Sequence, residues 1–142
     1  MSDPAINEVL ELNQQLLDSI ARGDWQTYQD LCDPTLTAFE PEARGHLVRG
    51  LEFHRFYFDL GVAEGPRNTT MASPKVRLMG DVALVTYVRL VQYLDDAGNP
   101  VTTHYEETRV WQQQSGRWQH VHFHRNACAE KDEVRKVISL SL

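Results

Sequence analysis

Three arginines occupy matching places in three segments that the sequence predicts to be β-strands. Side chains alternate between the two faces of a strand, so we expect Arg89, Arg109 and Arg125 on one face, among aromatic and branched neighbours. Buried guanidinium groups are costly without partners, so such a cluster is either balanced by carboxylates or kept for an anionic ligand. The alternation places one acidic residue, Glu107, among them, and a single carboxylate cannot neutralise three arginines. The pattern predicts a pocket for a small carboxylate or an acidic peptide side chain, with a structural ion network as the alternative.

Histidines at alternate positions raise the question of a metal site. His120, His122 and His124 lie in the stretch "RWQHVHFHRN", and a strand would point all three the same way. Three such residues span roughly 13 Å at about 3.3 Å per residue, too far for the outer two to share one zinc ion at bonds of about 2 Å. No cysteine or aspartate lies at a recognisable ligand spacing. We therefore expect no metal and no cofactor, and interpret the histidines as polar residues at a packed interface.

Acid–base catalysis is a further chemistry that these residue types could perform. His54, Glu107 and a tyrosine could serve inside a conical pocket, as in small isomerases and dehydratases. However, the sequence contains no nucleophile elbow, no phosphate-binding glycine loop and no dyad with diagnostic spacing. We predict that the chain is not an enzyme.

Helices at the N-terminus would position one side of such a pocket. Asp3 is the expected N-cap of a first amphipathic helix, Pro4 its first residue, and Gly23 its C-terminal stop. A short second helix is predicted over residues 24–32, and a third over residues 45–61. The third is apolar around much of its circumference, which indicates packing on more than one side.

Residues 69–126 are predicted to form an antiparallel sheet of long strands joined by tight turns. Pro74 interrupts the first strand, which indicates a sheet edge or a bulge. Helices followed by a strand meander predict an α+β domain. We expect the N-terminal helices to pack in a curved sheet that forms a cone around an interior pocket.

The opposite face of this sheet is too apolar to face water along the longest strand. An exposed apolar face of this size is typical of an association surface, so we predict that the protein forms a homo-oligomer. The predicted interface residues are Val82, Leu84, Val88, Leu90, Val110, Trp118 and His122.

Composition limits the classes of protein that the chain can represent. Its 142 residues fit one domain, which we place at residues 1–127, followed by a tail at residues 128–142. A net charge of −6 argues against non-specific nucleic-acid binding. With no signal peptide, no run of eighteen apolar residues, and two cysteines that form no disulfide framework, we predict a cytoplasmic protein with no membrane partner.

Four blocks of the sequence resemble one known family. They are "CDPTLTAFEPEARGHLVRGLEFHRFYF" (residues 32–58), "YVRLVQY" (87–93), "EETRVW" (106–111) and "VHFHR" (121–125). In this order they resemble the association, or hub, domain of calcium/calmodulin-dependent protein kinase type II. The resemblance runs from about Ile6 to Asn126, which is nearly the whole predicted domain.

The resemblance implies a cone-shaped fold of the nuclear-transport-factor-2-like (NTF2-like, or cystatin-like) type that assembles into two stacked rings, either a dodecamer or a tetradecamer. It implies a non-catalytic domain, joined in the family to a calmodulin-binding kinase, although these 142 residues contain no kinase motif and no basic amphipathic helix ahead of Ile6. It also implies a pocket for small carboxylates lined by His54, Arg89, Arg109 and Arg125, to which the alternation pattern adds Glu107. The alternative is a free-standing binding protein, or an isomerase or dehydratase, that uses the same pocket.

Overall fold

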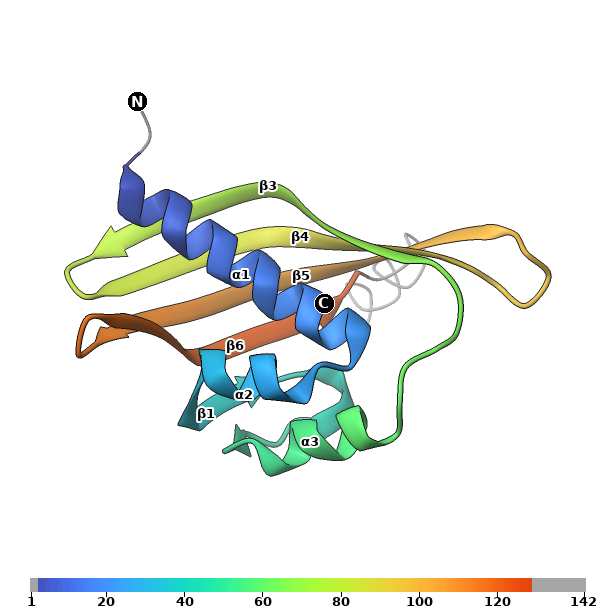
Figure 1. Cartoon of the computed structure of the whole chain (residues 1–142), viewed down its shortest axis with the longest axis horizontal. Coiled ribbons are helices and arrows are strands. Elements are labelled where there is room, and N and C mark those ends of the chain that lie inside the picture. Colours follow the sequence, from blue (N-terminus) through green and yellow to red (C-terminus); the bar gives the residue numbers. More distant parts are fainter. Residues whose placement is uncertain (1–2, 129–142) are drawn as a thin grey trace, which may run out of the picture.

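Six strands form one curved sheet, and the helices cover one of its faces (Figure 1). The computed structural model describes residues 3–128, so the predicted tail lies outside the described residues apart from Cys128. The strand order is β2-β1-β6-β5-β4-β3. In chain order the elements are α1 (Pro4–Arg22), α2 (Trp25–Leu31), β1 (Cys32–Phe39), the 3₁₀ helix η1 (Pro41–Ala43), β2 (Val48–Arg49), α3 (Glu52–Asp59), β3 (Arg67–Met79), β4 (Val82–Leu94), β5 (Pro100–Gln114) and β6 (Arg117–Ala127). This arrangement confirms the predicted α+β class.

Helix α1 begins and ends where its capping residues predicted. The Asp3 side chain accepts a hydrogen bond from the backbone N–H of Ala5 at 2.8 Å, and Gly23 closes the helix with a left-handed φ of 68°. The buried face of the helix contributes Val9, Leu16 and Leu17 to the core. The indole Nε1 of Trp111 donates to Oδ1 of Asn13 at 3.0 Å, which fixes α1 against β5.

The region between α2 and α3 differs from the sequence prediction. Cys32 was predicted to end the second helix, but it begins β1, which pairs in parallel with β6 and makes the sheet mixed. The predicted third helix, residues 45–61, is helical only over Glu52–Asp59. Gly50 has a φ of 75°, which a right-handed helix cannot include, and the preceding residues pair with β1 as β2.

Pro74 lies at an irregularity of the edge strand β3, as its position predicted. The register between β3 and β4 shifts between Ala72 and Lys75, and Ser73 has a φ of 51°. The bulge distorts a long edge that would otherwise present a regular row of unpaired backbone groups.

A second bulge, in β6, changes which side chains face the helices. Val110 pairs with His122 while the next residue, Trp111, pairs with His120, so Val121 is an extra residue in β6. The alternation of the strand is therefore inverted ahead of the bulge. The prediction that all three histidines share the outer face is wrong, because His120 is fully buried on the helix side.

Trp118 requires the same correction as His120. It was predicted to lie on the outer face with the interface residues, but it lies on the helix side and is 5% exposed as part of the hydrophobic core. The cause is again the extra residue in β6, which sequence alternation did not include.

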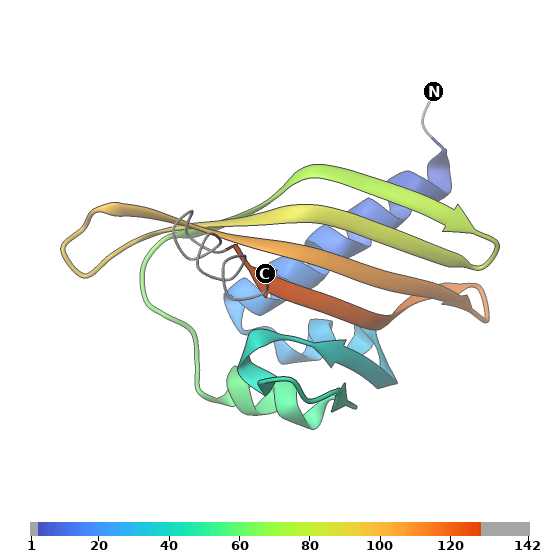
Figure 2. The same ribbon diagram turned by 180° about the vertical axis from the view of Figure 1, so that it is seen from behind.

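The outer face of the sheet carries no helix among residues 3–128 (Figure 2). Five predicted interface residues lie on it and are half-buried within one chain: Val82, Leu84, Val88, Leu90 and Val110. Phe39, Met79 and Leu94 lie on the same face and are 40%, 49% and 47% exposed. In the part of the chain that the structure describes, no helix is long and apolar enough to cross a membrane.

Candidate functional site: an arginine-lined cavity

A cavity of about 450 Å³ lies between the helix side of the sheet and the three helices. Four of the five predicted ligand-binding residues line it: His54, Arg89, Arg109 and Arg125. Register explains why the strand residues meet, because β4, β5 and β6 pair Tyr87 with Glu107 and Glu107 with Arg125. The predicted convergence of the arginines on one face is therefore present in the fold.

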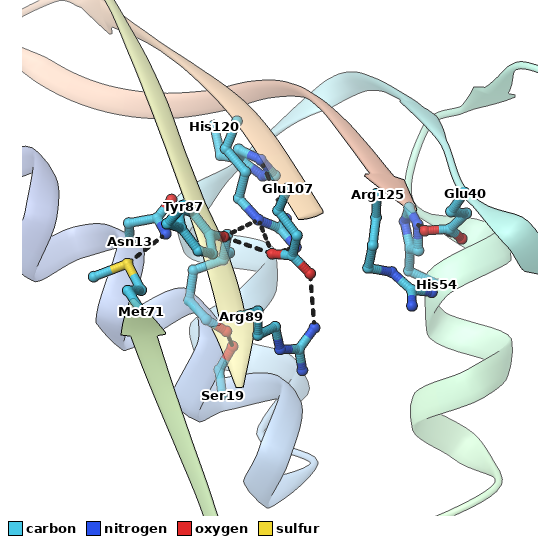
Figure 3. Close-up of polar contacts among 12 residues, drawn as sticks. Asn13, Ser19, Glu40, His54, Met71, Tyr87, Arg89, Glu107, His120 and Arg125 are labelled. Carbon is cyan, nitrogen blue, oxygen red and sulfur yellow. Dashed lines mark hydrogen bonds and ion pairs between the residues drawn. The ribbon is translucent and has the colours of Figure 1, made fainter. Parts of the chain in front are cut away.

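Glu107 is the centre of the polar network behind the cavity wall (Figure 3). Its side chain has no exposed surface. It accepts hydrogen bonds from the Tyr87 hydroxyl at 2.6 Å and from Nη1 of Arg89 at 3.2 Å. Burial acts to raise the pKa of Glu107, but the charges of Arg109 and Arg89 outweigh it and hold the pKa at about 2.

Arg109 is engaged by the protein at every nitrogen of its guanidinium group. Nε donates to the Tyr87 hydroxyl at 2.8 Å, and Nε and Nη2 donate to Oε1 of Glu107 at 3.1 and 3.0 Å. Nη1 lies 3.4 Å from Nε2 of His120, and the guanidinium carbon lies 4.3 Å from the centre of the Phe123 ring. With 1% exposure, Arg109 holds the network together and has little surface left for a ligand.

Arg89 and Arg125 are less completely satisfied. Nε of Arg89 is buried without a hydrogen-bond partner in the described structure, and only its Nη1 reaches Glu107. Arg125 forms an ion pair with Glu42 of η1. Both guanidinium groups approach the Tyr105 ring, at 5.9 and 5.1 Å from its centre.

His54 forms a second ion-pairing centre at the α3 side of the cavity (Figure 3). Its Nε2 lies 3.1 and 3.2 Å from the two carboxylate oxygens of Glu40. A carboxylate only accepts, so Nε2 carries the hydrogen of this contact. The other ring nitrogen, Nδ1, is buried without a partner in the described structure.

His120 is a buried neutral histidine. Arg109 can only donate, so Nε2 of His120 accepts, and Nδ1–H faces Sγ of Cys32 at 3.4 Å. Complete burial, followed by the charge of Arg109, lowers the pKa of His120 well below its usual range. Burial likewise raises the pKa of the Cys32 thiol to about 12.

The structure adds four polar residues that the sequence reasoning did not select: Glu40, Glu42, Arg67 and Tyr87. Tyr87 shared a face with Arg89 in the strand alternation, so that signal was present. Glu40 and Glu42 lie in the block "FEPEA", far from the strands in sequence, and only the parallel pairing of β1 with β6 brings them to the arginines.

Metal ligation is not the use of these histidines that the geometry favours. The β6 bulge separates His120 from His122 and His124, which lie on the outer face near Phe39. His122 instead meets the Thr37 hydroxyl, with Nδ1 and Oγ1 2.7 Å apart. Within residues 3–128 no group of three histidine, cysteine, aspartate or glutamate side chains is placed to hold a metal ion.

Helices packed in a curved sheet around an internal cavity define a protein of the NTF2-like class. A solved structure of an NTF2-like protein of unknown function from Pseudomonas putida superimposes with a TM-score of 0.76, covering 94% of this chain and 93% of its own. At 21% identity this similarity concerns the fold alone.

The chain belongs to the calcium/calmodulin dependent protein kinase II association domain family, whose pattern it matches over residues 5–129. It is 49% identical over 122 residues to the calcium/calmodulin-dependent protein kinase type II subunit delta of Oryctolagus cuniculus, covering 84% of this chain and 23% of that relative. The chain therefore spans about a quarter of the length of that kinase. The hub homology domain of Chlamydomonas reinhardtii has a TM-score of 0.83 and 50% identity, over 88% of this chain and 99% of that structure. These matches confirm the resemblance and the fold that it implied.

Proposed function

We propose that the chain is a non-catalytic association domain whose copies assemble into stacked rings of twelve or fourteen. The observation that carries this proposal is the outer sheet face, which presents apolar side chains with no helix over them among residues 3–128. Membership of an association-domain family supports the same use of that face.

The test of assembly is the solution mass by light scattering after size exclusion, over a range of protein concentrations. A mass near a dozen protomers that persists on dilution is the expected result. Leu84→Asp or Val88→Asp places a charge in the proposed interface and is expected to reduce the mass while circular dichroism stays unchanged. Ala97→Asp, in the exposed β4–β5 turn, is the matched control. An unchanged mass in both interface variants would refute the role of the outer face.

A second proposed function is the binding of small carboxylates in the cavity. Its wall carries four arginines, Arg67, Arg89, Arg109 and Arg125. Three carboxylates oppose them: Glu40 and Glu42 in the wall, and Glu107 behind it. This balance leaves one positive charge even when His54 is neutral, which favours an anion.

Calorimetry with sodium butyrate tests this second function, with butyramide as the uncharged control. Arg125→Gln removes a cavity-facing charge from a partly exposed position and is expected to abolish butyrate binding while the ring mass stays unchanged. Equal binding of butyrate and butyramide would refute recognition of the charge.

A further inference from the structure

Glu42 differs from the other two carboxylates around the cavity in how firmly it is held. The side chains of Glu107 and Glu40 are 0% and 5% exposed, whereas that of Glu42 is 37% exposed. Glu107 accepts from three side chains, but Glu42 is held by Arg125 alone among the described side-chain contacts. Glu42 is therefore the carboxylate that can leave its arginine at the lowest cost in free energy.

A second hollow, on the other side of η1, offers Glu42 alternative partners. It also has a volume of about 450 Å³, and Glu42 lines both hollows. Arg44, His46 and Arg49 contribute basic groups to the second one, and Glu42 is the only acidic residue among its described lining residues. A carboxylate that leaves Arg125 thus finds positive charge on either side of the 3₁₀ helix.

The contact between Glu42 and Arg125 uses the same chemistry as the proposed ligand. Partial burial acts to raise the pKa of Glu42, but the hydrogen bond and charge of Arg125 outweigh it, so the side chain is an anion near neutral pH. Arg125 has a single guanidinium group, and an incoming carboxylate must compete with Glu42 for it.

We propose that Glu42 is a resident carboxylate that occupies Arg125 in the unliganded domain and moves toward Arg44 and Arg49 when a small carboxylate binds. The inference rests on the proposed carboxylate pocket and adds a built-in competitor to it. The affinity of the cavity is then set by the difference between two ion pairs of the same type, the ligand with Arg125 and Glu42 with Arg125.

The test is calorimetric titration of the full chain with sodium butyrate at constant ionic strength. Glu42→Ala is expected to bind butyrate about two- to fivefold more tightly than the wild type, the size of a partly exposed ion pair. Glu42→Gln, which keeps the side-chain volume, is expected to change affinity in the same direction. Glu8→Ala, at an exposed position of α1 outside both hollows, is the control for net charge and is expected to leave the affinity unchanged.

A double variant tests the second position of Glu42. Arg44→Gln with Arg49→Gln removes the outer partners and is expected to weaken butyrate binding in the wild type but not in Glu42→Ala. No butyrate binding by the wild type or by either Glu42 variant would refute the pocket itself. Binding by the wild type with equal or weaker binding by both Glu42 variants would overturn only the competitor. An unchanged affinity of the double variant would overturn the movement toward the second hollow.

Discussion

The Glu107 carboxylate and the Arg109 guanidinium lie two residues apart on β5 and meet through a single oxygen. Nε and Nη2 of Arg109 donate to Oε1 of Glu107 at 3.1 and 3.0 Å, and the second oxygen is left for Arg89 at 3.2 Å. One buried carboxylate thus connects the two arginines on adjacent strands. This connection divides the predicted cluster into a structural pair, Glu107 and Arg109, and a more accessible part that includes Arg125.

Replacing Arg109 with alanine is expected to destabilise the domain strongly. The change leaves the buried Glu107 carboxylate without its main partner, and breaking a buried pair in this way costs about 3–5 kcal/mol. Urea unfolding followed by circular dichroism measures the loss. Arg77→Ala, at an exposed position of β3, is the matched control and is expected to change the free energy of unfolding by less than about 0.5 kcal/mol. A small effect for Arg109→Ala would mean that the network does not stabilise the fold.

Glu107 is expected to make the domain sensitive to strong acid. Its pKa is about 2 in the folded protein against 4.5 as the ordinary value, so the unfolded state binds the proton first. The stabilisation, about 3 kcal/mol, is fully present above the unfolded value and is lost as the pH falls from about 4.5 toward 2. Urea unfolding at a series of pH values measures it. Glu107→Gln is expected to lose this acid-dependent component, and a slope identical to the wild type would contradict the assignment.

His120 is expected to add a dependence at milder acidity. Its pKa in the folded protein is lowered well below the ordinary 6.5 by burial and by Arg109. The unfolded chain therefore gains a proton that the folded chain does not, and stability falls as the pH drops below about 6.5. The same unfolding series with His120→Gln is expected to show a flatter profile between pH 6.5 and 5. His46→Gln, at an exposed position, is the control and is expected to keep the wild-type slope. Equal slopes in both variants would refute the role of His120.

The two cysteines are expected to differ in reactivity. Cys32 is 2% exposed and its thiol pKa is raised by burial to about 12, while Cys128 is exposed. A thiol reagent such as 5,5′-dithiobis(2-nitrobenzoic acid) at pH 8 is expected to react with Cys128 alone in the folded protein and with both in urea. Cys128→Ser should then be unreactive until it unfolds. Rapid reaction of the folded Cys128→Ser variant would show that the β1–β6 core opens readily.

The regular elements of the fold could be predicted because their signals are local. Asp3 and Gly23 mark the ends of α1 through hydrogen bonds and backbone conformation within a few residues. Alternation along β4 and β5 was enough to place Arg89, Glu107 and Arg109 on one face. It failed in β6, because the bulge at Val121 depends on the neighbouring strand rather than on the residues around it.

The sequence by itself determined the α+β class, the helix caps and the common face of the arginines, because period-two and period-3.6 patterns depend on the chain's own geometry. Tertiary structure alone decided which carboxylate neutralises which arginine. Glu42 reaches Arg125 across 83 residues through the parallel pairing of β1 with β6, and no local pattern encodes a contact of that separation. It also decided that His120 lies inside and His122 outside, because one extra residue in a strand exchanges the two faces.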